Sequence, residues 1–570
     1  MASLHPRPRS SSPTSAPPAP PEKKARLDAE PSASALLATN ATSASSLLAS
    51  TPSDATQSSK DPKKGPPKNK KNKKRAHVAP EPFSAEDILN REVVALLGQE
   101  YADAANAQEA DWDAPFEQST ELELTVACIS PSSGQALSVA SVNDRKWVIV
   151  TPLSLPGERI RVKISRHSRL HSHAKLLETV ESNSEWRDTS RVQCRYLANV
   201  QVMLSYERQL ELKRETVSDA YKYYSNIPPE SVPPIQPTIG SPLQYGYRTK
   251  LTPHFHRPPM AFQKAVKRGE PVEGKPDWLK IGFNELGSRN VLDIEECPIA
   301  TPIVSKTIGP VKENIVKNIH KYTNGATLLL RDSLPLSADN ESSSNCTEDD
   351  EHICVTDHKT TVRERVGDMF FEYNANTFFQ NNNSALVPLT SYVQDAIFPA
   401  DSESRQRFPR PTHLVDAYCG SGLFSIMLAR HFDKVAGIEL SAESIRAAQH
   451  NAELNRLPAE KISFIAGDAA NIFDTVQDFP REHTVLIIDP PRKGTDQRFI
   501  QQMLAFSAQT VVYVSCNVHT QARDVGSILE AGSKMVQEGV GRKYVLQSLC
   551  GLDLFPQTAH VESIVVLSLE

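Results

Sequence analysis

Three ionisable residues next to apolar runs, in the C-terminal part of this 570-residue sequence, are the best candidates for chemistry. Asp489 ends the run "TVLIID", Cys516 ends "TVVYVSC", and Glu562 opens "ESIVVLSL". A thiolate attacks electron-poor carbon, and a nearby carboxylate can accept a proton. Each also has an ordinary explanation when it is taken singly: Asp489 as a helix N-cap, Cys516 as a packed thiol and Glu562 as a solvated surface charge. Their shared position at the ends of predicted strands favours a catalytic group.

A second set of residues, at the ends of two earlier strands, predicts a cofactor site. The glycines of "DAYCGSGLFS" (416–425) allow a tight turn into a helix and a close approach to a ligand. Glu439, 23 residues after Asp416, can accept hydrogen bonds from a ribose diol, and Asp468 can lie beside an adenine amine. Position 425 is Ser rather than the third Gly of a dinucleotide fingerprint, so the site favours S-adenosyl-L-methionine.

The cysteine and the glutamate together fit methylation of a uracil ring. Thiolate addition to C6 makes C5 nucleophilic toward a sulfonium methyl group, and the C5 proton must leave before the thiol is eliminated. Cys516 is the candidate nucleophile and Glu562 the candidate proton acceptor. The loop "DPPRKG" (489–494) carries Arg492 where enzymes that methylate amino groups usually carry an aromatic residue.

These residues need a parallel sheet to bring them together. From residue 410 onward, short apolar runs alternate with helical patterns such as "SAESIRAAQHNAELNRL", which predicts an α/β, Rossmann-like doubly wound sheet. Ligands of such sheets bind at the carboxyl ends of the strands. Asp416, Glu439, Asp489 and Cys516 are all expected at that edge.

The rest of the chain divides by composition. Residues 119–180 alternate apolar and polar positions between turn-formers, which predicts a small OB-type β-barrel. Between Asp144 and Lys175 the sequence has eight Lys or Arg and two acids, so this barrel is expected to present a basic face to RNA. Residues 195–375 predict an α/β cap with an acidic surface insertion at 333–358. Residues 376–570 form the predicted catalytic domain.

The N-terminal segment differs from the rest in composition. Residues 1–82 contain 14 of the 42 prolines and no aromatic residue, so we expect a disordered basic tail over 1–110. The run 63–75 has eight basic residues and no acid, a pattern typical of nuclear import or nucleic-acid contact. No stretch reaches the roughly 18 apolar residues of a membrane span. Eight scattered cysteines favour a reducing compartment, in the nucleus or cytoplasm, with a mitochondrial location left open.

The motifs, taken jointly, resemble those of the uracil-5 RNA methyltransferases, the group of TrmA and RumA with its eukaryotic, fungal-type members. The similarity runs from about 119 to 570 and includes a TRAM-like barrel ("LPGERIRVKI"), "NTFFQNN", "DAYCGSG", "GIEL", "DPPRKG", "YVSCN" and "HVESIVVL". The resemblance implies S-adenosyl-L-methionine as methyl donor and the T-loop uridine 54 of tRNA as substrate. It also implies cofactor contacts by Gln380, Tyr418, Glu439 and Asp489, a Cys516 nucleophile and a Glu562 proton acceptor.

One departure from the family pattern concerns metal. Some relatives bind an iron–sulfur cluster with four cysteines, whereas this chain retains Cys194 and Cys297 but lacks the expected C-x-x-C pair. We therefore expect no iron–sulfur cluster and no metal ligand set. No membrane and no obligate protein partner is inferred.

Two other functions stay open from the sequence. A cytosine-5 RNA methyltransferase would share cysteine attack but usually has a second cysteine in the fourth-strand loop, which here reads "DPPR". A non-catalytic tRNA-binding or tRNA-folding protein on the same fold would not need the pairing of Cys516 with Glu562.

Overall fold

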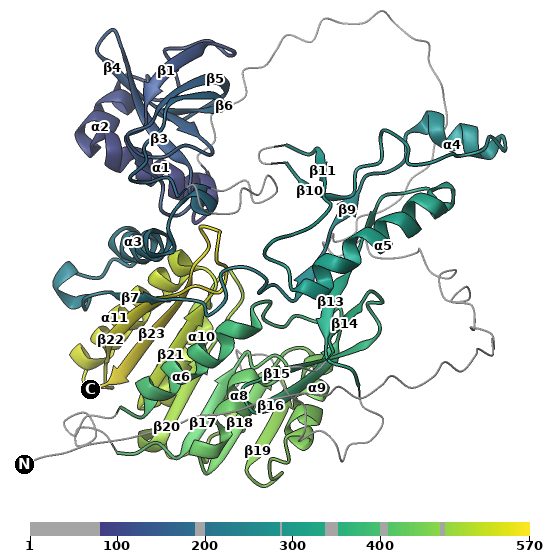
Figure 1. Cartoon of the computed structure of the whole chain (residues 1–570). Coiled ribbons are helices and arrows are strands. Elements are labelled where there is room, and N and C mark those ends of the chain that lie inside the picture. The colour runs from purple at the N-terminus through teal and green to yellow at the C-terminus, as the bar shows by residue number, and fades with distance from the viewer. Residues whose placement is uncertain (1–79, 189–199, 286–287, 337–350, 400–408, 468–472) are drawn as a thin grey trace, which may run out of the picture. The chain divides into compact units, whose positions relative to one another are not determined.

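The computed structural model describes residues 80–188, 200–285, 288–336, 351–399, 409–467 and 473–570 (Figure 1). Four features of the sequence analysis therefore lie outside the described residues: the tail up to residue 79, Asp468, Cys194, and the middle of the acidic insertion. Among the described helices, none is long and apolar enough to cross a membrane.

The largest sheet contains eight strands in the order β19-β18-β17-β20-β21-β23-β22-β7. These strands are β7 (Gln236–Ile239), β17 (His413–Ala417), β18 (Lys434–Glu439), β19 (Ile462–Ala466), β20 (Thr484–Ile488), β21 (Thr510–Ser515), β22 (Tyr544–Leu552) and β23 (Glu562–Leu569). Strands β17 to β21 pair in parallel, as predicted, but β23 runs antiparallel to both β21 and β22. This reversal brings the start of β23 to the edge where β21 ends.

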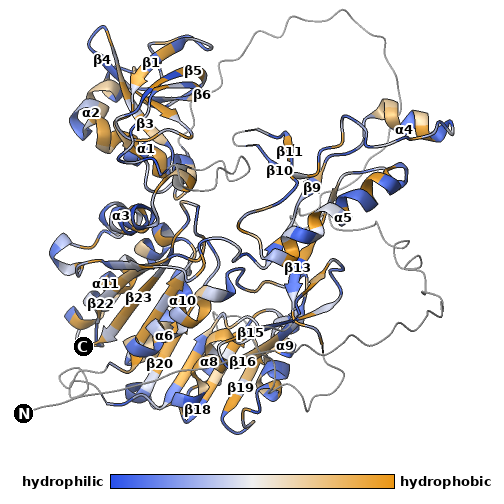
Figure 2. Cartoon of the chain, viewed as in Figure 1, coloured by the Kyte–Doolittle hydropathy of each residue, from blue (hydrophilic) through white to orange (hydrophobic). Residues whose placement is uncertain are grey.

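Helices cover both faces of this sheet. The helices are α3 (Tyr206–Tyr224), α6 (Leu386–Ile397), α8 (Leu423–Leu428), α9 (Ala442–Leu454), α10 (Gln497–Phe506) and α11 (Val518–Gln537). Strand residues alternate between two apolar cores: Val415 packs with α3, α10 and α11, whereas its neighbour Leu414 packs with α6, α8 and α9. Figure 2 shows these strands as mainly hydrophobic, which is why their sequence runs are almost continuously apolar.

A separate six-stranded sheet, in the order β1-β5-β6-β4-β3-β2, occupies the region predicted to be a barrel. Its strands are β1 (Glu121–Thr125), β2 (Cys128–Ile129), β3 (Ala136–Val142), β4 (Arg145–Thr151), β5 (Arg159–Ser168) and β6 (His171–Glu181). Trp147 is buried in its core and donates from Nε1 to Ser172 Oγ at 2.9 Å. That the sheet is of the TRAM type stays a prediction.

The predicted boundary of the disordered tail, at residue 110, is wrong. Residues Ala85–Leu97 and Gln99–Ala107 form helices α1 and α2, and Leu89 and Val93 lie in the core of the six-stranded sheet. Ser84 caps α1 by accepting a hydrogen bond from the Asp87 backbone. A low proline content and a helical spacing of apolar residues begin after residue 82, in agreement with these helices.

Among its described residues, the central part of the predicted cap contains two small sheets and two helices. Sheet β11-β10-β9-β12 and sheet β14-β13-β8 accompany α4 (Met260–Lys267) and α5 (Pro302–Asn318). The strands are β8 (Lys250–Leu251), β9 (His254–Phe255), β10 (Gly282–Asn284), β11 (Val291–Asp293), β12 (Ala326–Thr327), β13 (Leu330–Ser333) and β14 (Ile353–Val355). The acidic insertion starts and ends in paired strands, since Ser333 is opposite Ile353.

The predicted cap limits of 195–375 also need correction at both ends. Helix α3 and strand β7 belong to the large sheet, because α3 packs on its core and β7 pairs with β22. At the other end, the hairpin of β15 (Thr361–Val366) and β16 (Met369–Asn374) contacts α9: the Glu372 backbone donates to Asn451 Oδ1 at 2.7 Å. Periodicity alone did not indicate which core each segment joins.

Candidate active site

A cavity of about 1080 Å³ opens at the carboxyl ends of β17, β18, β20 and β21. The residues around it include every site residue singled out from the sequence that the structure describes: Gln380, Tyr418, Glu439, Asp489, Cys516 and Glu562. These side chains come from six separate parts of the chain, and the fold brings them together at one edge of the sheet. Their positions therefore agree with the prediction, while their individual roles stay predictions.

The turn after β17 shapes one end of the cavity. Tyr418 has φ of +64°, Gly420 +54° and Gly422 +93°. Asp416, fully buried, fixes this turn because its Oδ2 accepts hydrogen bonds from Ser425 N at 2.9 Å and Ser425 Oγ at 2.6 Å. Burial raises the pKa of Asp416 to about 7, although the bonds from Ser425 act to lower it. Asp416 therefore holds the backbone of the turn rather than contacting a ligand directly.

Glu439, the last residue of β18, lies beside this turn. Its Oε2 accepts from Gly420 N at 3.3 Å and its Oε1 from Ser441 N at 2.9 Å. Each carboxylate oxygen keeps a further acceptor site, so the group can still bind a ribose diol.

The lining near this turn fits an uncharged nucleoside. Ser421 Oγ and Asn381 Oδ1 are buried without a hydrogen-bond partner, and both residues line the cavity. A Cβ built on Gly420 would meet no atom within 4 Å, so that glycine borders open space. The basic lining residues Arg492, Lys493 and Arg523 all come from the DPPRKG loop and α11. Because no phosphate seat is needed for it, S-adenosyl-L-methionine fits this arrangement.

Gln380 lies in the segment between β16 and α6. Its neighbour Phe379 is buried and stacks on Tyr373 with ring centroids 4.7 Å apart, while Phe378 is 72% exposed at the cavity. Thr249 N donates to Asn381 O at 2.9 Å, which ties the segment to the cap. The local sequence assigns no role to Gln380, because only its position in the folded chain distinguishes it from other loop residues.

The DPPRKG loop (489–494) after β20 is fixed to α11. Arg492 O accepts hydrogen bonds from Asn517 Nδ2 and from Thr520 Oγ1, both at 3.0 Å. Gly494 has φ of +76°, and a Cβ there would collide with the carboxylate of Asp524. These bonds hold the loop close to Cys516, which directly precedes Asn517.

The register of β21 and β23 places Cys516 beside Glu562. Ser515 pairs with Ser563, so the next residues out, Cys516 and Glu562, adjoin each other at the rim. Gln521, fully buried, links the strands by donating to Tyr513 O at 2.8 Å and to Ser563 O at 3.2 Å. Cys516 is half-buried, while Glu562 is 2% exposed.

Desolvation dominates the electrostatics at the rim. Burial, helped by the nearby Glu562 and Asp489 and opposed by Arg492, raises the pKa of Cys516 to about 11. The positive charge of Arg492 acts to ionise this thiol, but desolvation is the larger effect. Burial and Asp489 likewise raise the pKa of Glu562 to about 8, and burial raises that of Asp489 to about 7. The thiol is therefore protonated at neutral pH before substrate binds.

The loop between β22 and β23 (residues 553–561) also lines the cavity, through Phe555 and His560. A fully buried ion pair anchors it: Lys213 Nζ from α3 contacts Asp553 Oδ1 and donates to Phe555 O at 3.1 Å. Tyr206 OH donates to the other carboxylate oxygen of Asp553 at 3.0 Å. Burial lowers the pKa of His560 to about 4, so its ring is neutral at pH 7.

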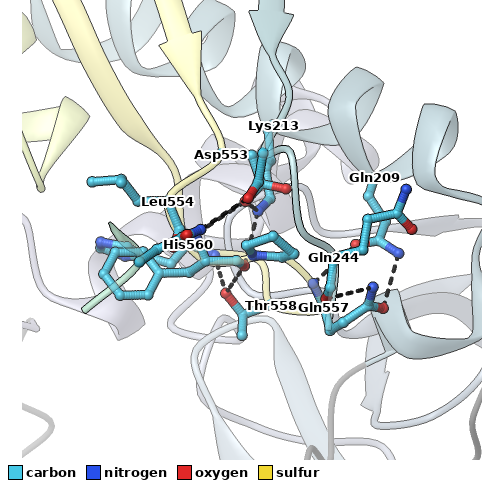
Figure 3. Close-up of polar contacts among 12 residues, drawn as sticks. Gln209, Lys213, Gln244, Asp553, Leu554, Gln557, Thr558 and His560 are labelled. Atoms are coloured by element: carbon cyan, nitrogen blue, oxygen red, sulfur yellow. Dashed lines mark hydrogen bonds and ion pairs between the residues drawn. The ribbon is translucent and has the colours of Figure 1, made fainter. Parts of the chain in front are cut away.

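The same loop is bound further along by uncharged groups (Figure 3). Gln209 and Gln557 form a reciprocal pair, since Gln209 Nε2 donates to Gln557 Oε1 and Gln557 N donates to Gln209 Oε1, both at 3.1 Å. Tyr247 OH from the cap donates to Pro556 O at 2.9 Å. We call these contacts, with those of Lys213 and Tyr206, the loop clamp. The sequence analysis missed it, because its partners lie more than 300 residues apart.

The six-stranded sheet presents less free positive charge than predicted. Six of the eight basic residues between positions 144 and 175 form ion pairs with acids from neighbouring segments. These pairs are Arg145–Asp113, Arg159–Glu123, Arg161–Glu178, Lys163–Glu121, Arg166–Glu86 and Arg169–Asp111. The predicted basic face counted only the acids within the run and omitted those on neighbouring segments.

Comparison with known proteins identifies the family. Residues 349–570 match the family model described as tRNA (Uracil-5-)-methyltransferase. The tRNA (uracil(54)-C(5))-methyltransferase of Schizosaccharomyces pombe is 42% identical over 458 residues, covering 80% of this chain and 79% of the relative. The chain belongs to the tRNA (uracil-5-)-methyltransferase family. The enzyme of the same name from Saccharomyces cerevisiae is 35% identical, covering 74% of this chain and 69% of the relative.

A solved structure gives the fold independently of close sequence similarity. The tRNA (uracil-54, C5)-methyltransferase of Pyrococcus abyssi, in complex with S-adenosyl-L-homocysteine, has a TM-score of 0.51 and 21% sequence identity. The match covers 78% of this chain and all of that structure. The predicted α/β methyltransferase fold is therefore confirmed.

The iron–sulfur prediction is not tested by these findings. Cys297 is buried in the apolar core of the cap, with Leu251, Ile294 and Val304 in the same cluster. Cys194 lies outside the described residues. The expected absence of a cluster stays a prediction.

Proposed function

We propose that this chain transfers a methyl group from S-adenosyl-L-methionine to C5 of uridine 54 in tRNA. The proposal rests on one observation: Cys516 and Glu562 line the same cavity as Glu439 and the glycine turn. The two fungal relatives, named as uracil-54 enzymes, support the choice of nucleoside and position.

Cys516 begins the reaction. Its thiol releases its proton to solvent as Sγ bonds to C6 of the uracil, and the C5–C6 π electrons move into the ring to form an enolate. The Arg492 guanidinium, which lowers the pKa of Cys516, stabilises the negative charge on sulfur as this bond forms. When bound, S-adenosyl-L-methionine supplies the electrophilic methyl group that C5 takes up.

Glu562 ends the reaction. Its carboxylate accepts the proton from C5, and the electron pair of that C–H bond re-forms the C5–C6 double bond as Sγ leaves. The thiolate then regains a proton. Because burial raises the pKa of Glu562 to about 8, it accepts a proton more readily than an exposed glutamate does.

The cofactor contacts are assigned by residue. Glu439 holds the ribose diol, and the Gly420 turn allows the close approach of the nucleoside. Gln380, Tyr418 and Asp489 complete the pocket, with Asp489 nearest the reacting centre because its charge acts on both Cys516 and Glu562. The uridine must leave its stack to reach this cavity, and the exposed ring of Phe378 offers it an aromatic face.

The test is nucleoside mass spectrometry of unmodified tRNA incubated with the purified chain and S-adenosyl-L-methionine. The proposal requires 5-methyluridine at position 54, absent with Cys516→Ala and retained with Cys354→Ser, a half-buried cysteine of the cap that does not line the cavity. Formation of 5-methylcytidine would favour the cytosine-5 alternative. Tight tRNA binding with no modification would favour the non-catalytic alternative.

We also propose that the chain reaches the nucleus through the basic run at 63–75. The proposal is supported by eight basic residues without an acid in that run. Imaging a fluorescent fusion in which these eight residues are Gln tests it: the signal should leave the nucleus, and an unchanged nuclear signal would contradict the proposal.

A further inference from the structure

Three potential metal ligands meet where α1 contacts the six-stranded sheet, away from the catalytic cavity. They are Glu86 from the first turn of α1 and His171 and His173 from β6. One ligand atom from each lies within 4.8 Å of the other two. The two histidines are two positions apart on one strand, so their side chains lie on the same face of the sheet. Glu86, which lies 85 residues before His171 in the sequence, contacts them from α1. Because of this separation the cluster is not visible as a sequence motif, and no metal ligand set was expected from the sequence.

The two imidazole rings have unused nitrogen atoms. Both His171 Nε2 and His173 Nε2 are buried without a hydrogen-bond partner. His171 is fully buried, and its Nε2 lies 3.5 Å from Glu86 Oε1; His173 Nε2 lies 3.9 Å from Glu86 Oε2. Burying a polar atom without a hydrogen-bond partner costs free energy of folding. Two such nitrogen atoms beside one carboxylate therefore indicate a site for a ligand.

Surrounding groups orient the cluster as they do in metal sites. His171 Nδ1 is 2.8 Å from Arg169 O, and a proton on Nδ1 that donates to this carbonyl leaves Nε2 with a free lone pair. Ser168 Oγ donates to Glu86 Oε1, and Arg166 Nη2 lies 3.4 Å from Glu86 Oε2.

We propose that Glu86, His171 and His173 bind a Zn²⁺ ion that joins α1 to the six-stranded sheet. Imidazole nitrogen and carboxylate oxygen are common zinc ligands, and three protein ligands leave a fourth position for water. Tetrahedral zinc with bonds of about 2.0–2.1 Å places neighbouring donor atoms about 3.3 Å apart. The two Nε2 atoms lie 3.5 and 3.9 Å from different oxygens of Glu86, and one donor atom from each residue lies within 4.8 Å of the others, so the donors must move closer together to reach that geometry. Such a site would fix the N-terminal helix that the composition had suggested was disordered.

The test is metal binding by the full-length chain. The purified protein is stripped with a chelator, dialysed, and titrated with Zn²⁺ in competition with a chromophoric chelator; Co²⁺ is added in parallel and its d–d absorption is recorded. Loss of an outer-shell partner alone typically weakens metal binding about 10–100-fold, so loss of a direct ligand in Glu86→Gln or His173→Asn should weaken it at least as much. His358→Asn, a histidine exposed in the cap, is the matched control.

Thermal unfolding gives an independent readout. Zn²⁺ should raise the melting temperature of the wild type and the His358→Asn control, but not of Glu86→Gln or His173→Asn, because only a ligand that binds the folded state stabilises it. Both substituted side chains are partly exposed, so these variants are expected to fold, and circular dichroism checks this. One zinc per chain that survives both substitutions, or no zinc binding by the wild type, would overturn the proposal.

Discussion

Cys516, Glu562 and Asp489 share one poorly hydrated rim, where Asp489 raises the pKa of both other groups and Glu562 raises that of Cys516. Two negative charges so close together are costly, so the three groups resist full ionisation at neutral pH. Arg492 is the described cation that opposes this effect on both Cys516 and Glu562. The reaction therefore depends on two opposing effects. Desolvation favours the protonated forms of Cys516 and Glu562, whereas the Arg492 guanidinium favours their ionised forms.

Replacing the proposed base should stop the reaction after the first bond forms. In Glu562→Gln the C5 proton has no acceptor, so turnover should fall by about 10²–10⁴-fold, the usual contribution of general acid–base catalysis. A covalent protein–tRNA adduct should accumulate, visible as a band of reduced mobility on a denaturing gel. The control Glu530→Gln removes an exposed carboxylate of α11. Normal turnover by Glu562→Gln would contradict the assignment.

The pH profile should report the same base. Glu562 must be ionised to accept a proton, and since its pKa is raised to about 8, the rate at which the methylated covalent adduct loses its C5 proton should rise with pH up to about 8 and level above it. Arg492→Met removes a charge that lowers this pKa, so the rise should move to higher pH, whereas Arg492→Lys should shift it less. Saturating tRNA separates this effect from binding. Identical profiles for all three proteins would contradict the proposed role of Arg492.

Strand-end position accounts for how much of the site the sequence could predict. Asp489, Cys516 and Glu439 stood out because each chemical residue ends an apolar run, and parallel strands bring such ends together. Gln380 and Tyr418 came only from family resemblance, because nothing in their local sequence distinguishes them from loop residues. The raised pKa of Cys516 was not predictable, because desolvation depends on packing from segments distant in sequence.

At the scale of elements, the active site depends on a loop held from three sides. Residues 553–561 connect β22 to β23, carry Phe555 and His560 into the cavity, and lead directly to Glu562. The loop clamp draws on α3 and the cap, and Asn382 Nδ2 from the segment before α6 also donates to Leu554 O at 3.2 Å. We therefore infer that these buried polar contacts position the base.

Breaking the ion pair of the clamp should cost both stability and turnover. Asp553→Asn leaves the cation of the fully buried Lys213 without a counter-charge, and removing one partner of a buried pair typically costs about 3–5 kcal/mol. Urea denaturation measures this loss. Turnover should fall while cofactor affinity is retained, because neither Asp553 nor Lys213 lines the cavity that Glu439 and the glycine turn border.

The matched control for this prediction is the exposed pair of Glu530 and Lys534. Lys534→Met removes a salt bridge of the same type on the surface of α11, where such pairs contribute little. If Asp553→Asn unfolded no earlier than Lys534→Met and turned over at the wild-type rate, the clamp would have no positioning role.

The elements themselves were predictable in part. Alternating apolar runs and helical patterns predicted the parallel strands β17 to β21, since each run has the length and composition of a buried strand. The reversal of β23, the addition of β7, and the packing of α3 on the sheet were not predictable. Those features depend on pairings such as Cys550 with Gln236, which no local pattern specifies.

At the scale of the whole molecule, charge is unevenly distributed along the chain. Six basic residues of the six-stranded sheet are neutralised by acids, whereas residues 1–79 contain 14 Lys and Arg against 5 Asp and Glu. Affinity for RNA phosphates follows the number of positive charges that can displace counterions. The N-terminal segment is therefore expected to supply much of the nonspecific attraction to tRNA.

Removing that charge should weaken binding without changing the chemistry. A chain in which the eight basic residues of 63–75 are Gln should bind tRNA less tightly, and its affinity should depend less steeply on salt concentration. Turnover at saturating tRNA should stay at the wild-type level, since no residue of that run belongs to the described cavity. Filter binding over a salt series measures the slope. If the dependence of tRNA affinity on salt concentration were unchanged, the phosphate contacts would have to come from other parts of the chain.

The central claim is that the sulfur atom of Cys516 bonds to C6 of the uracil during each turnover. Transfer RNA carrying 5-fluorouridine at position 54 tests it directly, because fluorine cannot leave C5 as a cation and the adduct should stay trapped. After digestion with ribonuclease and trypsin, mass spectrometry should find the methylated fluorouridine nucleotide on the peptide that contains Cys516. An adduct on any other residue, or free methylated product with no adduct, would contradict the account.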